Sequence, residues 1–186
     1  MDKTRKYPGR LPGDISKGEL IARIIRADQA GKYGAMRIYD GQLAVLGGTS
    51  DGPVLREMAK TEKHHLQTFN KLIVSRQVRP TALAPLWHAA GFALGAGTAL
   101  MGREAAMACT AAVEEVMGKH YGDQAAQLAA EDETELLTTV KTIRDEEIAH
   151  KETVLTEGTR QAPAYPLLSS AVKSGSRLAI WLSERF

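Results

Sequence analysis

Two Glu-x-x-His motifs are the residues of this chain whose types and spacing best suit chemistry. Glu62 precedes His65 by three positions, and Glu147 precedes His150 by the same interval. This spacing places both side chains of a motif on one helix face. A single such motif is usually part of a solvated face, but here both interrupt apolar stripes with helical spacing: Leu55, Met58, Phe69 and Leu72 in the first segment, and Leu136, Val140, Ile143 and Val154 in the second.

Buried carboxylates are costly without a compensating charge. Metal ions shared between the two motifs would supply that charge, as in carboxylate-bridged dinuclear bundles. Oxygen and imidazole ligands suit iron or manganese, and the lack of thiolate ligands argues against structural zinc. We therefore predict that the segments carrying these motifs are facing helices with a metal centre between them.

Dinuclear bundles take one further carboxylate from each of two other helices. Glu114 precedes Glu147 on an apolar face, and the position that precedes Glu62 by a similar interval is Lys32. The interval from Lys32 to Glu114 nearly equals that from Glu62 to Glu147, so the chain consists of two similar halves. The first half carries a cation where the second carries a carboxylate.

Lys32 changes the charge balance of the predicted centre. Four glutamates would neutralise two divalent ions, whereas three glutamates and a lysine leave a charge that one divalent ion balances. We therefore predict that Lys32 reduces metal loading from two ions to one or none, with its ammonium stabilised by Glu62 and Glu147. The alternative is that Lys32 extends to solvent.

The sequence gives weaker support for a role of other polar residues in the site. Tyr121 follows Glu114 by two helical turns on the same face. It could hydrogen-bond a ligand or the substrate in a catalytic role, or be a buried structural tyrosine. Asp28 or Asp145 could orient a ligand histidine, although surface pairing is the common fate of such residues. The remaining histidines have no partner visible in the sequence and are not predicted to be ligands: His64, His88 and His120.

The elements that must position these residues are helices. Ser16 or Asp14 can cap a helix that ends near Leu46, and further helical patterns cover about 53–78, 83–121, 133–158 and 167–184. We predict an all-α fold, a four-helix bundle with additional apolar or amphipathic helices that associate with a membrane. Residues 1–13 are expected to be a flexible N-terminal segment, and residues 14–186 a single domain.

Composition narrows the class of protein further. The net charge of +2 and the 5% of aromatic residues do not favour a nucleic-acid partner. The single Cys109 excludes an internal disulfide, and we expect no signal peptide because the basic N-terminal residues are not followed by an apolar run. Residues 80–102 carry no charge, and residues 167–186 are amphipathic. Each segment fits either a docked bundle helix or a helix on a lipid surface.

Long stretches of the chain resemble demethoxyubiquinone hydroxylase of ubiquinone biosynthesis. The resemblance covers about residues 14–186 and rests on RIIRADQAGKYGAMRIYDGQLAVLG, EKHH, PLWHAAGFALGAGTALMGREAAMACTAAVEE, RDEEIAH and LAIWLSERF. It implies a ferritin-like fold and a di-iron monooxygenase, an oxidoreductase with two irons per chain. By this resemblance the metal ligands are Glu62, His65, Glu114, Glu147 and His150.

The same resemblance implies the reaction and its setting. Family members add the penultimate ring hydroxyl of the pathway to a demethoxyubiquinol, using dioxygen and electrons traced to NADH. They lie on the matrix face of the mitochondrial inner membrane or on the cytoplasmic face of a bacterial membrane. Eukaryotic members pair with a lipid-binding partner protein of the pathway. The isoprenoid tail length and any oligomer are left open.

One motif departs from the family pattern. The family reads HAGEYGA, with the glutamate as sixth ligand, where this chain reads QAGKYGA with Gln29 and Lys32. Reversing the charge at a ligand position predicts impaired activity. The alternative is a catalytically silent quinone-binding or scaffold member of the same fold. Iron storage is a third class, which the long uncharged segment disfavours.

Overall fold

Six helices make up the part of the chain that the structure, a computed structural model, describes. It covers residues 13–156 and 165–186, without the side chains of residues 150–156 and 165, so most of the predicted flexible segment 1–13 lies outside it. The helices are α1 Lys17–Leu46, α2 Gly52–Ser75, α3 Ala84–Leu100, α4 Arg103–Ala130, α5 Thr134–Thr156 and α6 Tyr165–Ser183. No strand occurs among these residues, which confirms the predicted all-helical bundle.

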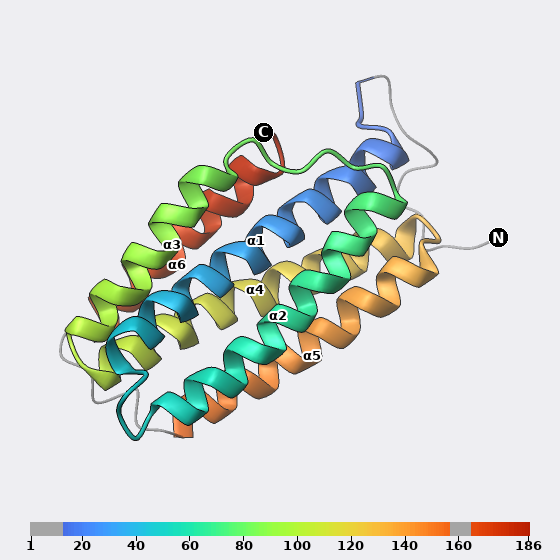
Figure 1. Ribbon diagram of the computed structural model, residues 1–186. Coiled ribbons are helices and arrows are strands. Elements are labelled where there is room, and N and C mark those ends of the chain that lie inside the picture. Colours follow the sequence, from blue (N-terminus) through green and yellow to red (C-terminus); the bar gives the residue numbers. More distant parts are fainter. Residues whose placement is uncertain (1–12, 157–164) are drawn as a thin grey trace.

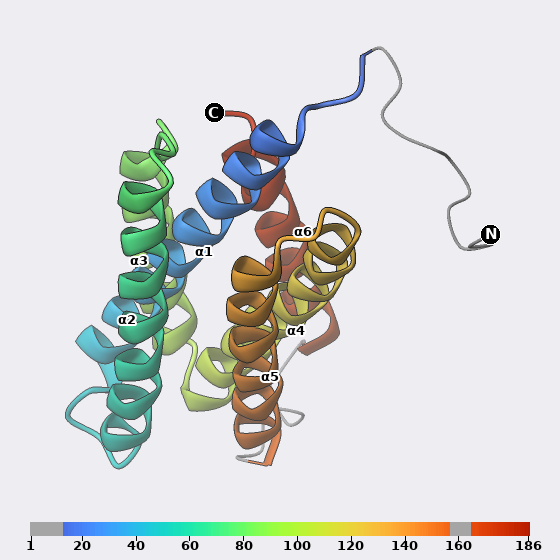
Figure 2. The ribbon, with the colours of Figure 1, turned by 90° about the vertical axis from the view of Figure 1, so that its right-hand side faces the viewer.

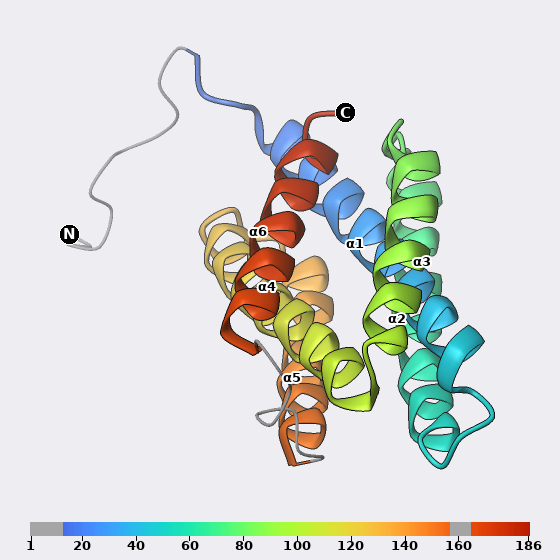
Figure 3. The same cartoon turned by 90° about the vertical axis from the view of Figure 1, so that its left-hand side faces the viewer.

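The helices form two layers of three. In one layer α1 packs between α2 and α3, and in the other α4 packs between α5 and α6. Figures 2 and 3, which view the bundle from its two sides, show the layers face to face. The halves of the chain thus repeat the same order, a long central helix followed by two flanking helices. This arrangement agrees with the half-repeat seen in the spacing of the sequence motifs.

Local sequence explains where the helices begin and end. The Ser16 hydroxyl accepts a hydrogen bond from the Glu19 amide at 3.1 Å, as predicted for an N-cap. The apolar region 83–121, read as one unit from the sequence, belongs to two helices. It breaks at Gly102, whose φ of +113° suits glycine rather than residues with a side chain. The second helix also ends at Ser75, slightly before the predicted residue 78.

The hydrophobic core lies between the layers. Its largest cluster joins four helices and includes Ile25, Phe69, Tyr121, Leu128, Leu136 and Val140. Within one layer, α1 and α3 approach closely because glycines face the contact. A Cβ atom at Gly95 would overlap the Ile38 carbonyl group. The core therefore fixes α1, α2, α4 and α5 around a common centre.

The uncharged stretch of the sequence forms α3, which is 17 residues long. Within the described ranges, none of the helices has the length and apolar character needed to cross the bilayer. In Figure 1 α3 and α6 overlap along one edge of the bundle, and Figure 3 shows them apart, with α3 in one layer and α6 in the other. The membrane-associating role expected for these helices remains a prediction.

Candidate functional site

Four buried side chains from three helices converge between the two layers. They are Lys32 of α1, Glu62 and His65 of α2, and Glu147 of α5, each 1% exposed. The Lys32 ammonium donates to both Glu62 oxygens, at 3.1 and 3.3 Å, and to Glu147 Oε1. The alternative in which Lys32 extends to solvent is therefore wrong. Helical spacing explains the burial, since all four residues lie on core-facing stripes.

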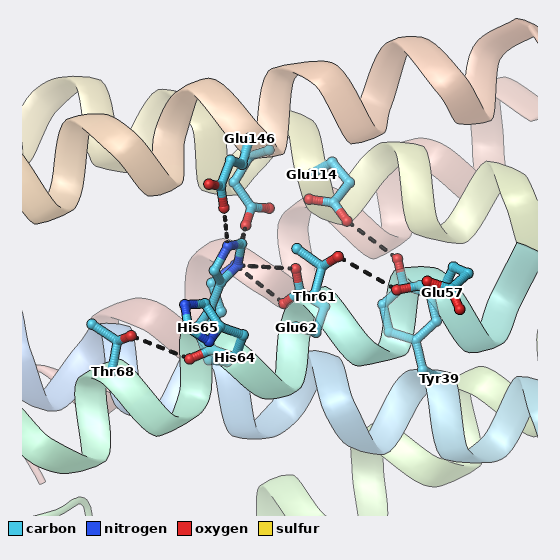
Figure 4. Close-up of polar contacts among 11 residues, drawn as sticks. Tyr39, Glu57, Thr61, Glu62, His64, His65, Thr68, Glu114 and Glu146 are labelled. Atoms are coloured by element: carbon cyan, nitrogen blue, oxygen red, sulfur yellow. Dashed lines mark hydrogen bonds and ion pairs between the residues drawn. The ribbon is translucent and has the colours of Figure 1, made fainter.

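The His65 ring lies between two groups of carboxylates. Its Nδ1 atom is 3.5 Å from both Glu62 Oε1 and Glu147 Oε1. Its Nε2 atom bonds to Glu146, and Figure 4 shows the ring reaching from α2 toward that residue. Burial alone would lower the pKa of His65, but the hydrogen bonds to Glu147 and Glu62 outweigh it and raise the pKa to about 9. The ring is thus an imidazolium at neutral pH in the metal-free protein.

Burial and the charges of their neighbours shift the pKa values of Lys32, Glu114 and Glu147. Burial would lower the pKa of Lys32, but the charges of Glu147 and Glu62 outweigh it and hold the pKa well above its usual value. Burial would raise the pKa of Glu147, and the adjacent Lys32 lowers it well below its usual range. Burial, reinforced by the negative charge of Glu147, raises the pKa of Glu114 well above its ordinary value. The pKa values of Glu114 and Glu147 are therefore shifted in opposite directions.

Glu114 reaches the site from α4. Its Oε1 atom accepts a hydrogen bond from the Tyr39 hydroxyl at 3.4 Å, a contact visible in Figure 4. Its other carboxylate oxygen has no hydrogen-bond partner among the described residues. The site therefore contains an unused buried oxygen beside the cluster of Lys32, Glu62 and Glu147.

The donor atoms suit a metal ion, but the Lys32 ammonium already contacts some of the same residues. Glu62, His65 and Glu147 each offer one ligand atom, and these atoms lie within 4.8 Å of one another. Oxygen and imidazole donors fit iron or manganese. The Lys32 ammonium contacts two of the same three residues. The described residues therefore fit a dinuclear centre incompletely, because a protein cation already neutralises part of the ligand set. The His150 side chain lies outside the described residues.

The structure places Tyr121 beside the cluster but not in its hydrogen bonds. The residue is fully buried, and its ring stacks on Phe69 with centroids 6.4 Å apart. The Lys32 ammonium lies 5.6 Å from the ring centroid. The Tyr121 hydroxyl has no hydrogen-bond partner in the described part of the chain. Of the alternatives considered for Tyr121, a hydrogen bond to one of the described ligand residues is not formed, and the ring is buried as a structural tyrosine would be.

The residue that orients His65 was missed from the sequence. Asp145 is exposed and pairs with Arg144, and Asp28 accepts from Gln124 at 2.8 Å and lies 3.4 Å from His120. Neither aspartate contacts His65, and Glu146 takes that position instead. The available signal was its place in RDEEIAH: one helical turn before His150, it lies beside the core stripe.

A second feature, an apolar cavity of about 470 Å³, lies among α1, α3, α4 and α6. Its walls include Gly31 and Val113, the sequence neighbours of Lys32 and Glu114. The central helices α1 and α4 thus line both the cavity and the polar cluster. The hollow exists because small residues face it from three helices: Ala27, Ala30, Gly34, Ala90, Gly91, Ala171, Gly175 and Ala179.

Over the residues that the structure describes, fold and site together define a bundle of six helices with a buried carboxylate–histidine cluster and an adjoining apolar cavity. Residues 19–183 match the family described as ubiquinone biosynthesis protein COQ7, and the chain belongs to that family. It is 57% identical over 177 residues to the 3-demethoxyubiquinol 3-hydroxylase of Rhodospirillum rubrum, covering 95% of this chain and 83% of that protein.

Eukaryotic relatives agree with this assignment. The chain is 55% identical over 180 residues to the human mitochondrial NADPH-dependent 3-demethoxyubiquinone 3-hydroxylase, covering 95% of this chain and 82% of the relative. It is 41% identical over 186 residues to the mitochondrial 5-demethoxyubiquinone hydroxylase of Saccharomyces cerevisiae, with 91% and 80% covered. The resemblance noted in the sequence is thereby confirmed at the level of the family.

Proposed function

We propose that this protein acts at the hydroxylation step of ubiquinone biosynthesis, with a demethoxyubiquinol as its substrate. The observation that carries the proposal is an apolar cavity beside a buried carboxylate–histidine cluster, in a chain similar to named hydroxylases of this substrate. A quinol substrate has a polar ring and a long apolar tail. It therefore needs a polar reaction site next to an apolar binding space.

The cavity suits the apolar part of such a substrate. Its volume of about 470 Å³ lies within the range of roughly 300–1,000 Å³ that ligand pockets span. Few polar groups face it, and one of them, the Trp87 indole, is already satisfied by a hydrogen bond to Ser183 Oγ at 3.0 Å. A tail in this space would be held by apolar contact, with its ring directed past α1 and α4 toward the cluster.

Iron is the cofactor that this reaction would use. Glu62, His65, Glu114, Glu147 and His150 are the residues proposed to hold it, and bound iron would supply the activation of dioxygen. A monooxygenase transfers one oxygen atom to its substrate and reduces the other to water. The electrons would come from a nicotinamide dinucleotide: the resemblance implies NADH, whereas the names of the mammalian relatives specify NADPH.

The edge formed by α3 and α6 is proposed to lie on a membrane surface. Large apolar side chains are exposed on these helices or at their ends: Leu86, Leu100, Met101, Leu167, Leu178, Trp181 and Phe186. Arg185 stacks over the Trp181 ring at 4.2 Å, a pairing of cation and aromatic ring that suits a lipid interface. The membrane would be the matrix face of the mitochondrial inner membrane or the cytoplasmic face of a bacterial membrane. This edge also suits the lipid-binding partner protein of eukaryotes.

Vesicle flotation tests the membrane proposal. The protein should float with anionic phospholipid vesicles, and replacing Leu178 and Trp181 by glutamine should release it. Val74→Gln is the matched control, since Val74 is 76% exposed but lies on α2 at the opposite edge. The proposal would be contradicted if all variants floated equally, or if the wild-type chain stayed in the fraction that contains no vesicles.

Product formation tests the reaction. Iron-loaded protein, a demethoxyubiquinol, a nicotinamide dinucleotide and dioxygen should yield the hydroxylated quinol, detected by mass spectrometry. Gly175→Leu should fill the cavity and lower both binding and turnover at least tenfold, because a Cβ atom there meets open space. Gly122→Leu is the control: its Cβ is equally unobstructed, but it does not line the cavity. If both variants lost binding and turnover equally, the proposal that the cavity binds the substrate would be contradicted.

A second function is favoured by one observation, the ammonium of Lys32 within the cluster. A quinone-binding protein without catalytic activity would bind demethoxyubiquinol as tightly as an enzyme but form no product. Binding measured by fluorescence quenching of Trp87, which lines the cavity, separates the two functions when combined with the product assay. Binding without product, in protein shown to contain iron, would favour the silent function.

A further inference from the structure

The two halves of the bundle repeat residue by residue around the polar cluster. Position 32 on α1 corresponds to Glu114 on α4 in the half-repeat of the sequence. The same interval along the chain relates Asp28 to Thr110, Tyr39 to Tyr121 and Gln42 to Gln124. All these residues are buried in the structure. The repeat therefore allows each contact in one half to be compared with its counterpart in the other.

The counterparts meet across the two central helices. Gln42 of α1 donates to Thr110 of α4 at 3.2 Å, and Gln124 of α4 donates to Asp28 of α1 at 2.8 Å. These two contacts are the same interaction seen from opposite halves. The tyrosines should behave in the same way, each directing its hydroxyl at the side chain across the bundle.

Only one of the two tyrosines has an acceptor among the described residues. Tyr39 donates to the Glu114 carboxylate at 3.4 Å. Tyr121 faces Lys32, and its buried hydroxyl has no hydrogen-bond partner in the described ranges. The Lys32 ammonium could donate to the phenol oxygen, but it donates to Glu62 and Glu147 instead. It has no acceptor atom to offer to the Tyr121 O–H group. The unpartnered Tyr121 hydroxyl therefore marks position 32 as one that the surrounding bundle fits to a carboxylate.

The ammonium itself lies where a cation is needed. It contacts Glu62 at 3.1 Å and also Glu147, the two carboxylates that the two motifs contribute. We propose that Lys32 replaces both a carboxylate ligand and the metal ion beside it, so that this chain binds at most one divalent ion at a centre built for two. The inference deepens the proposed function and depends on it only for the identity of the metal.

Metal counting tests this proposal directly. Chelator-treated protein would be loaded anaerobically with Fe²⁺ or, in parallel, Mn²⁺, desalted, and analysed for metal per chain. We expect at most one ion in the wild-type chain and two in Lys32→Glu. Lys60→Glu, a substitution of the same type at an exposed residue of α2, is the control and should match the wild type. Two ions per wild-type chain would overturn the proposal.

Thermal stability gives a readout that does not require exact stoichiometry. In chelator, Lys32→Glu should melt below the wild type, because it adds a fourth buried carboxylate and removes the ammonium. At metal concentrations about 100-fold above the dissociation constant, it should gain about 5–10 °C. The wild type should gain less than half of that rise. An equal rise in both chains would contradict the proposal.

Tyr121 supplies an independent test. In the wild-type chain, Tyr121→Phe removes only an unpartnered hydroxyl and should leave the melting temperature unchanged or slightly raised. In metal-loaded Lys32→Glu the same substitution should lower it, because the hydroxyl then has an acceptor. Tyr39→Phe should lower it in both backgrounds. Equal effects of Tyr121→Phe in the two backgrounds would show that the hydroxyl does not respond to residue 32.

These outcomes separate the inference from the proposed function. If Lys32→Glu binds two ions and the wild type at most one, the inference stands even when neither chain converts demethoxyubiquinol. If the wild type binds two ions, the inference fails even when the chain proves to be an active hydroxylase.

Discussion

Replacing Lys32 by methionine should reveal how much the buried ammonium stabilises the metal-free bundle. Methionine keeps an unbranched side chain of similar length but removes the charge. Lys32 is 1% exposed and neutralises two carboxylates that are themselves 1% exposed. Without it, Glu62 and Glu147 would share the interior with the His65 ring as their nearest described cation.

The expected loss follows from the burial of this ion pair. Removing one partner of a buried pair typically costs about 3–5 kcal/mol, because the other charge is left uncompensated. One of the two glutamates can reduce this loss by taking up a proton. The lower end of that range, about 3 kcal/mol, is therefore the expected decrease in the free energy of unfolding. For a chain of this size it corresponds to a fall in melting temperature of roughly 6–12 °C.

Urea and thermal unfolding in the presence of a chelator measure this loss. Lys60→Met is the matched control, since Lys60 pairs with Glu57 at 3.7 Å while both side chains are more than three-quarters exposed. Exposed pairs contribute about 0–1 kcal/mol, so the control should unfold almost as the wild type does. Similar losses for the two variants would refute the view that Lys32 is the counter-ion of the cluster.

Three further predictions concern the groups around the cluster and the packing of the helices. Because the pKa of His65 is raised to about 9, the imidazolium should stabilise the metal-free fold fully below pH 6.5, and this stabilisation should be lost as the pH rises through about 9. His65→Gln should remove this pH dependence from the free energy of unfolding measured in urea. Glu146→Ala should lower metal affinity by roughly 10–100-fold, as loss of groups that orient ligands does, and Asp145→Ala, which touches no ligand, should leave equilibrium-dialysis affinity unchanged. Gly95→Ala should destabilise the bundle by about 1–3 kcal/mol in urea because its Cβ overlaps α1, whereas Gly97→Ala, with open space, should be neutral or stabilising; equal effects would contradict the close contact of α1 and α3.

The sequence predicts the bundle well because its helices carry regular apolar stripes. The same periodicity places Glu62 and Glu147 in the interior, and the spacing of the halves pairs Lys32 with Glu114. These predictions need only local periodicity and a repeat. They do not require knowledge of how the helices cross.

Features that depend on contacts across the bundle could not be predicted in the same way. The pairing of His65 with Glu146 joins α2 to α5. The place of Glu146 one helical turn before His150 puts it beside the core stripe, but it does not show which residue of α2 it contacts. The cavity arises from small residues on helices far apart in the chain, so the sequence of any one segment does not predict it. The unpartnered Tyr121 hydroxyl likewise requires knowing which residue lies across from it.

The location of the Lys32 ammonium in the presence of metal is the most direct test of the central claim. A crystal structure of the unmodified chain, grown with excess Mn²⁺ and measured for anomalous scattering, would show both the side chain and any ion. We predict that the ammonium contacts Glu62 and Glu147, with at most one anomalous peak in the cluster. Two peaks, with Lys32 turned away from the cluster, would contradict the claim.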